Sequence, residues 1–245
     1  MRRSVERVGR ALVAGLVLAL AVGAVAAPHG DVLARGAAQD GPVDVGLDPG
    51  HSDADVGAAG GGLREVDLTL ALALRIRPLL EAQGLRVALS REDNQPLTAM
   101  THPDLTTRTR LEQEARIAAV TPARIFVSVH FNGHPNAAIR GTETYYNGDN
   151  FGPESRRLAA ALQAHVVGEL RAAGVDTLDR GVKEDLTAGK PYGHFFSLRG
   201  PLPSALVEGL FLTNPQDAAA LRQDATLDAL ARGYAEGIRE YFAAP

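Results

Sequence analysis

The stretch from residue 43 to residue 90 constrains the fold most strongly, because two short apolar segments flank one long helical pattern. Val43 to Asp48 is a compact apolar run that stops at Pro49-Gly50, and Leu85 to Ser90 is a second such run. Between them, apolar side chains repeat at spacings of four and three, which puts them on one helical face: Leu68, Leu72, Ile76, Leu79 and Leu80. This strand–helix–strand order predicts two parallel strands joined by a right-handed crossover.

The rest of the chain continues this alternation and predicts a single three-layer α/β domain. Apolar runs predict strands at residues 124–130, 142–146 and 204–208. Helical patterns cover residues 108–119, 155–173 and 216–242. Residues 175–200 follow neither pattern. A length of 245 residues, 45% of them hydrophobic, suits one such domain with its own apolar core.

The N-terminus has the pattern of a signal peptide. Arginines within the first ten residues are followed by residues 11–27, which carry no charge and are rich in alanine and leucine. Small residues predict cleavage after Ala26 or Ala27, so residues 1–27 form the signal peptide and residues 28–42 a linker. An uncleaved anchor is the alternative, because the apolar run is only slightly short for a membrane span.

After cleavage the domain would begin at residue 43 and would contain no stable membrane span. It is expected to be exported, to the periplasm, the cell wall or the extracellular space. The chain contains no cysteine, which excludes a lipoprotein attachment site and a disulfide framework. The full chain has a net charge of −4, and removing the arginine-rich leader makes the remainder more acidic, which argues against nucleic acid as a partner.

Polar side chains occur where the predicted strands end. His51 closely follows the first strand, His130 ends the third, and Glu208 ends the strand near the C-terminus. In an open α/β sheet, groups just beyond the carboxyl ends of strands converge on one crevice. Glu65 opens the first long helix directly after a glycine-rich loop at residues 57–62, so it can reach the same edge. We therefore expect these side chains to lie together.

Two imidazoles and one carboxylate are the ligand set of a catalytic zinc ion that keeps a fourth position for water. His51, Glu65 and His130 supply such a set, which indicates hydrolysis. Their spacing is weak evidence, because they form no compact helical signature of paired histidines. Each also has an ordinary explanation: His51 follows a turn, Glu65 suits the helix dipole, and His130 is a core histidine.

Glu208 is harder to explain as an ordinary residue. It follows Ala205-Leu206-Val207, a segment expected to be buried, and burying a carboxylate beside apolar residues is costly unless it has a charged or hydrogen-bonded partner. A water activated by a metal ion would be such a partner.

These residues lie in segments that resemble the zinc-dependent N-acetylmuramoyl-L-alanine amidases of the Amidase_3 family. The first two matches are residues 48–51 (Asp-Pro-Gly-His) and residues 65–71, which resemble the first metal-binding segment of the family. Residues 126–132 resemble its second metal-binding segment, and residues 205–214 its catalytic segment. Weaker matches occur in family order at Ser90-Arg91, residues 141–146 and residues 179–183, so the resemblance extends from Val43 to the C-terminus.

The resemblance implies that His51, Glu65 and His130 bind Zn²⁺ and that Glu208 is the catalytic carboxylate. It also implies a sheet of about six mostly parallel strands flanked by helices, with residues 43–245 as the catalytic domain. The expected partner is peptidoglycan, and the expected reaction cleaves the amide between the lactyl group of N-acetylmuramic acid and L-alanine. Glu208 would take a proton from the attacking water and return it to the leaving amine.

The chain departs from the family pattern at three places. The arginine and the alanine–asparagine pair that the family has before the His130 strand have no clear counterpart among Arg108, Arg110 and Ala119. Ser52 replaces the glycine that usually follows the first histidine, and residues 184–194 are longer and more polar than the family leads us to expect, as in a surface loop near the peptide side of the cleft. Two other functions stay open: a zinc peptidase that acts on a bond within the stem peptide, and a wall-binding protein that has lost catalysis. Arg180 and Lys183 are expected either to meet the acidic stem peptide or to face solvent.

Overall fold

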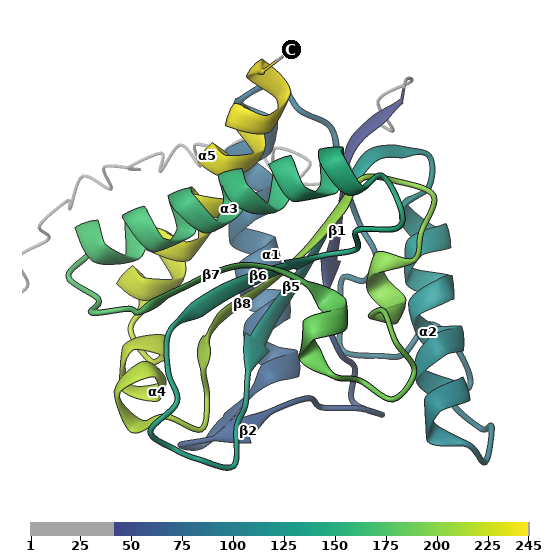
Figure 1. The fold of residues 1–245 in the computed structure, drawn as a ribbon, viewed down its shortest axis with the longest axis horizontal. Helices are drawn as coiled ribbons and strands as arrows, with labels where there is room; N and C mark the ends of the chain where they lie inside the picture. Colours follow the sequence, from purple (N-terminus) through teal and green to yellow (C-terminus); the bar gives the residue numbers. More distant parts are fainter. Residues whose placement is uncertain (1–41, 245) are drawn as a thin grey trace, which may run out of the picture. The chain divides into compact units, whose positions relative to one another are not determined.

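A computed structural model of the protein describes residues 42–244 (Figure 1). The predicted signal peptide and nearly all of the predicted linker fall on residues 1–41, outside the described residues, so both stay predictions. Across residues 42–244, no helix is both long enough and apolar enough to cross a membrane.

Six strands form one sheet in the order β4-β1-β5-β8-β6-β7. Their bounds are β1 (Val43–Pro49), β4 (Val87–Leu89), β5 (Ala123–Asn132), β6 (Thr142–Tyr146), β7 (Asp179–Glu184) and β8 (Ser204–Phe211). All neighbouring pairs are parallel except β6 and β8, which are antiparallel. The predicted six-stranded, mostly parallel sheet is therefore confirmed.

Helices cover both faces of the sheet and complete three layers (Figure 1). One face carries α1 (Glu65–Ala82), α3 (Gly152–Ala172) and α5 (Asp224–Ala243), and the other carries α2 (Leu105–Val120) with the short 3-10 helices η1 (Asp185–Ala188) and η2 (Phe196–Leu198). Val45 and Val127 pack into the first face, whereas Phe126 packs against Ile117 and Val120 of α2. Successive strand residues thus face different layers, as the period of two in a strand requires.

Parts of the described chain differ from the sequence prediction. Strand β7 lies in the segment that followed no pattern, because as an edge strand it is partly exposed along its length and carries polar residues. The predicted helix at residues 216–242 is two helices, α4 (Pro215–Leu221) and α5. The glycine-rich loop contains a short antiparallel ribbon of β2 (Ala59–Gly60) and β3 (Leu63–Arg64).

The register of the sheet places His130, Glu208 and Glu143 side by side on three neighbouring strands. Strand β5 continues to Asn132 and β8 to Phe211, so His130 and Glu208 lie within their strands rather than beyond the strand ends, which corrects the sequence-based expectation. Glu208 pairs across the sheet with His130 on one side and with Glu143 of β6 on the other. Directly paired residues share a face, so all three side chains start from the face that carries α2.

Candidate active site

His51 lies in the turn after β1, with a φ angle of 67°. A histidine occupies this left-handed region only where its surroundings hold it there. Arg116 donates hydrogen bonds to the carbonyl oxygens of Pro49 at 2.7 Å and of His51 at 2.5 Å. Arg91 donates to the carbonyl oxygens of Pro49 and Gly50, both at 2.8 Å. Two buried guanidinium groups therefore fix the path of the turn.

The fully buried Asp48 balances the charge of Arg116, at 3.2 Å. Asp48 also accepts hydrogen bonds from the hydroxyls of Ser90 at 2.5 Å and Ser128 at 2.9 Å. Burial alone would raise the pKa of Asp48, but the Arg116 charge and the two hydroxyls outweigh it and lower the pKa. Glu112 contacts Arg116 at 3.2 Å. The floor beneath the His51 turn is thus a satisfied buried ion network.

Glu65 is the first residue of α1 and is almost fully buried. Its Oε2 accepts a hydrogen bond from the backbone N–H of Ala58 at 2.7 Å, and its Oε1 accepts one from the backbone N–H of Phe131 at 3.0 Å. These two bonds from separate segments fix the orientation of the carboxylate. Its position in the first turn of a helix also favours a negative charge.

The imidazoles of His51 and His130 converge on this carboxylate. His51 Nε2 lies 3.1 Å and His130 Nδ1 lies 2.9 Å from Glu65 Oε1, and one donor atom from each of the three residues lies within 4.8 Å of the others. Burial would lower the pKa of His51, yet the charges of Glu65 and Asp55 raise it to about 10. The cluster therefore attracts positive charge, and its geometry could hold a metal ion.

Two glycines make room for the three donor groups. A Cβ atom added at Gly50 would lie 2.3 to 2.8 Å from ring atoms of His130. A Cβ atom added at Gly57 would lie 2.4 Å from Glu65 Oε2 and 2.7 Å from His51 Nε2, and Gly57 also has a φ angle of +71°. Such distances are too short for real contacts, so the cluster forms only where these positions lack a side chain.

Glu208 lies beside the cluster on the neighbouring strand. The residue as a whole is half-buried, but its Oε2 atom is inaccessible and has no hydrogen-bond partner among the described residues. Burial, together with the charge of Glu65, raises the pKa of Glu208 well above its ordinary value. A carboxyl oxygen left without a protein partner costs stability, and this is commonly found at sites of chemistry.

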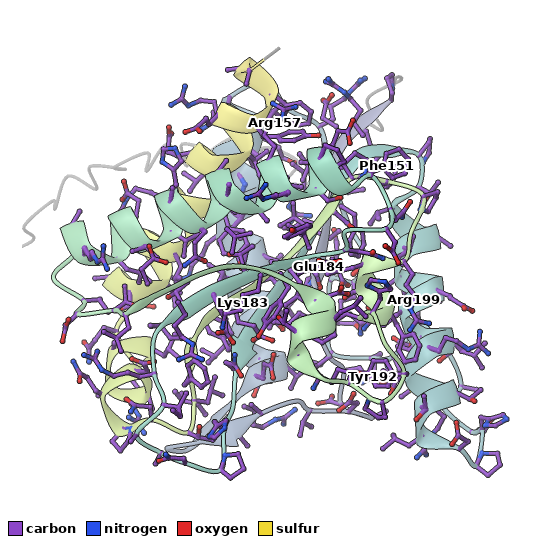
Figure 2. All side chains as sticks on the ribbon, in the orientation of Figure 1. Phe151, Arg157, Lys183, Glu184, Tyr192 and Arg199 are labelled. Carbon is purple, nitrogen blue, oxygen red and sulfur yellow. The ribbon has the colours of Figure 1, made fainter. Side chains whose placement is uncertain are left out.

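Glu143 lies opposite Glu208 but is fully satisfied. It accepts hydrogen bonds from Asn132 Nδ2 at 2.7 Å, Tyr145 OH at 3.0 Å and Arg180 Nε at 2.7 Å, and it also pairs with Lys183. Lys183, labelled in Figure 2, comes from the edge strand β7. Arg180 and Lys183 both pair with Glu143 while their side chains stay partly exposed, and a contact with the stem peptide stays a prediction.

A cavity of about 170 Å³ opens above the row of groups. His51, His130 and Glu208 line it together with Thr109 and Gln113 of α2. The remaining lining residues are Asp55, Lys190, Tyr192, Phe195, Phe196, Ser197 and Leu206. A larger cleft of about 500 Å³ lies between α2 and η2, but no histidine lines it. The smaller cavity is therefore the candidate active site.

Comparison with known proteins now identifies the kind of molecule. Residues 45–240 match the family described as Amidase_3, N-acetylmuramoyl-L-alanine amidase, which is most of the chain. The chain belongs to this amidase family. The predicted family resemblance is confirmed, and it supports amidase activity on peptidoglycan.

Individual amidases share this domain. LytC, an N-acetylmuramoyl-L-alanine amidase of Bacillus subtilis, is 34% identical over 197 residues, which are 80% of this chain and 35% of LytC. The chain thus matches about a third of the length of LytC. The germination-specific N-acetylmuramoyl-L-alanine amidase of the same organism is 30% identical over 199 residues, 80% of this chain and 78% of that protein.

Solved amidase structures have the same fold. CwlD from Clostridioides difficile, determined in complex with the GerS lipoprotein, is similar with a TM-score of 0.68 and 26% identity over 82% of this chain and 98% of that chain. The catalytic domain of CwlV from Bacillus (Paenibacillus) polymyxa has a TM-score of 0.61 and 28% identity over 83% of this chain and 99% of that chain.

Other residues of the amidase site escaped the sequence analysis. Arg116 and Asp48 anchor the His51 turn, and Glu143 shares the register row with Glu208. Arg116 could have been found as a charged residue on the predicted buried face of a helix. The weak family match at Ser90-Arg91 could have indicated the other residues that bind Asp48 and the turn. Among the other histidines, His134 is exposed, and His194 pairs with Asp185 and Asp149.

Proposed function

We propose that this protein is an exported, zinc-dependent amidase that cleaves the bond between the lactyl group of N-acetylmuramic acid and L-alanine in peptidoglycan. One observation carries the proposal: donor atoms of His51, Glu65 and His130 that could together hold a metal ion lie beside Glu208, which has a carboxyl oxygen without a partner within residues 42–244. The two histidines and Glu208 line one cavity. Membership of the amidase family supports the choice of bond.

The donor set fits zinc. His51 and His130 offer imidazole nitrogens and Glu65 offers a carboxylate oxygen, a set found in catalytic zinc sites with a position left for water. The hydrogen bonds to Glu65 from Ala58 and Phe131 orient this carboxylate as supporting residues do around metal ligands. When bound, zinc supplies a Lewis acid that polarises the scissile carbonyl and lowers the pKa of water.

Glu208 moves the proton in this proposal. Its Oε2 is not engaged by any described residue, so it can accept the proton of the attacking water. The same carboxyl then donates that proton to the amino group of L-alanine as the amide C–N bond breaks. Burial favours the protonated carboxyl between the two transfers, whereas a nearby cation favours the ionised one.

Mass spectrometry of digested wall fragments tests the bond. The expected products are muramic acid with a free lactyl carboxyl and a stem peptide that begins with a free L-alanine. An intact lactyl–alanine link with a cut further along the stem would instead establish a peptidase, and intact fragments that stay bound would establish a wall-binding protein.

Metal dependence needs its own measurement. A chelator should abolish clearing of a peptidoglycan gel, and stoichiometric zinc should restore it. Elemental analysis of the purified protein should find one zinc ion per chain. Full activity in metal-free protein would refute the zinc part of the proposal while leaving the bond assignment intact.

Export rests on the residue pattern of the N-terminus. N-terminal sequencing of protein recovered from outside the cytoplasm should begin at Ala27 or Pro28. A membrane-bound form that keeps Met1 would show that the apolar run acts as an uncleaved anchor.

A further inference from the structure

The cavity has a cationic side chain that the proposed reaction does not use. Lys190 lines the same cavity as His51, His130 and Glu208. No ion pair found within residues 42–244 involves Lys190, whereas the nearby Arg180 and Lys183 are both bound to Glu143. Asp55, another charged group of the cavity wall, lies 3.6 Å from His51 Nδ1. Lys190 is thus a lysine of the cavity wall that forms no ion pair with a described residue, although its charge acts at a distance to lower the pKa of Glu208.

The ammonium of Lys190 is positioned by its neighbours. Lys190 Nζ lies 5.8 Å from the centre of the Phe195 ring, within the range of a cation–π contact. Phe195 in turn meets Tyr145 edge to face, with ring centroids 5.2 Å apart. The backbone turns back immediately after Lys190, because Gly193 N–H donates to the Lys190 carbonyl at 3.0 Å.

The segment that carries Lys190 is fixed to the body of the protein. The fully buried Asp185 accepts hydrogen bonds from the Phe195 N–H at 2.7 Å and contacts His194 Nδ1 at 2.6 Å. Arg199 donates to the carbonyl oxygens of Tyr192 at 2.5 Å and His194 at 2.8 Å. Figure 2 shows Tyr192 and Arg199 close together beside α2. A segment held in this way presents Lys190 at a defined place.

The ring of Tyr192 adds a second fixed contact. It stacks on Phe196 with centroids 4.5 Å apart and an angle of 17° between the ring planes. Both rings line the cavity, and so does Lys190 from the same segment of the chain. The cavity therefore combines a reaction centre on one wall with an apolar platform and one cation on another.

We propose that Lys190 is a specificity residue that binds a free carboxylate of the peptide being cleaved. This inference rests on the proposed function, because it takes the stem peptide as the substrate. The second residue of a stem peptide is D-glutamate joined through its side chain, which leaves an α-carboxylate two residues from the scissile amide. An ammonium paired with that carboxylate at the rim of the cavity forms a charge-assisted hydrogen bond. Lys190 thereby selects stems whose second residue is acidic rather than amidated.

The test compares two muramoyl tripeptides that differ at one group. One has D-glutamate with a free α-carboxylate as its second residue, and the other has D-isoglutamine, in which an amide replaces that carboxylate. Lys190→Met should lower kcat/KM on the acidic substrate about tenfold, through KM, and should leave the amidated substrate almost unchanged. Lys190→Arg should keep most of the preference for the acidic substrate.

A matched control removes a charge of the same sign elsewhere. Arg156 is exposed on α3 and does not line the cavity, so Arg156→Met should leave both substrates unaffected. An equal loss on both substrates after Lys190→Met would overturn the proposal. Lys190 would then act by lowering the pKa of Glu208 or by maintaining the conformation of its own segment. Unchanged kinetics on both substrates would overturn it as well.

Binding separates this inference from the proposed function. The released tripeptides, acidic and amidated, are titrated into zinc-loaded wild type and Lys190→Met by calorimetry, which needs no turnover. A preference for the acidic peptide that disappears in the variant supports Lys190 even if the wild type cleaves a different bond. Equal binding of the two peptides by the wild type would overturn the role of Lys190 even if amidase activity is established.

Discussion

Glu208 and Glu143 occupy paired positions on neighbouring strands, but their surroundings shift the pKa of the two carboxyl groups in opposite directions. Glu143 receives four hydrogen bonds, two of them from the charged groups of Arg180 and Lys183, which lower its pKa although burial would raise it. Glu208 has an oxygen with no partner among the described residues, and its pKa is raised by burial and by Glu65. Two paired positions in one sheet thus hold a fully hydrogen-bonded carboxylate in one case and, in the other, a carboxyl group with an unpartnered oxygen, to which we assign the proposed chemistry.

The largest expected effect separates these roles through activity. Glu208→Ala should lower kcat by about a hundredfold to ten-thousandfold, because it removes the group that transfers the proton. Zinc content and folding should be unchanged, since Glu208 is not among the three metal-binding donors. Gel clearing, single-substrate kinetics and elemental analysis check the three parts. Undiminished activity would remove Glu208 from the mechanism and cancel the contrast with Glu143.

A second test extends the comparison to the third carboxylate, Glu65. Gly57→Ala should weaken zinc binding tenfold or more, since the new Cβ atom would lie 2.4 Å from Glu65 Oε2. Gly62→Ala is the matched control, because Gly62 has a similar φ angle of +78° but nothing within 4 Å of its added Cβ. It should cost only the backbone strain, about 1 kcal/mol of stability. Equal zinc affinity in the two variants would contradict the crowding argument.

The structural carboxylate should affect stability more than chemistry. Glu143→Gln should lower the free energy of unfolding by about 2 kcal/mol, because it leaves Arg180 and Lys183 without their partner. Glu114→Gln breaks an exposed pair with Arg110 and should cost less than about 0.5 kcal/mol. Urea denaturation compares the two. A loss of activity in Glu143→Gln as deep as that in Glu208→Ala would show that the two carboxylates are not functionally distinct.

The smallest expected effect is a pH dependence of stability. Because the pKa of Glu143 is lowered in the folded state, its contribution is complete above its ordinary pKa of about 4.3 and is lost as the pH falls further. The wild type should therefore lose stability more steeply than Glu143→Gln as the pH falls below about 4.3. Both proteins should still lose some stability in this pH range, because the pKa of Asp48 is also lowered in the folded state. Parallel curves would mean that Glu143 does not carry this linkage.

Much of the fold was predictable because apolar segments mark buried elements. The central strands β1, β5 and β8 are short apolar runs, and α1 shows a regular apolar face. Strand β7 was not predicted, because an edge strand needs no apolar alternation. The break between α4 and α5 at Arg222-Gln223 contains no glycine or proline and no side-chain cap on α5. Tertiary packing sets that break, and local sequence does not reveal it.

The site was predictable where residue type alone limits the chemistry. His51, Glu65, His130 and Glu208 were singled out from the sequence. The structure groups Glu65 with the two histidines, and His51, His130 and Glu208 line one cavity, while the roles of all four stay proposals. The partners of Glu143 were not predictable, because a charge on an edge strand reads the same whether it meets substrate, solvent or a buried carboxylate. Only the register of β6 against β8 and β7 decides among these.

The two arginines that hold the His51 turn have a consequence for when the enzyme becomes active. Arg91 and Arg116 donate hydrogen bonds to the backbone carbonyl oxygens of the turn, so protein contacts alone fix the conformation of the turn. A preformed turn loses little freedom when metal arrives, so folding and metal loading are separable events. Under the function proposed above, the exported chain would complete its fold before it binds zinc, so the supply of zinc outside the cytoplasm, rather than the rate of synthesis, would set the number of active molecules.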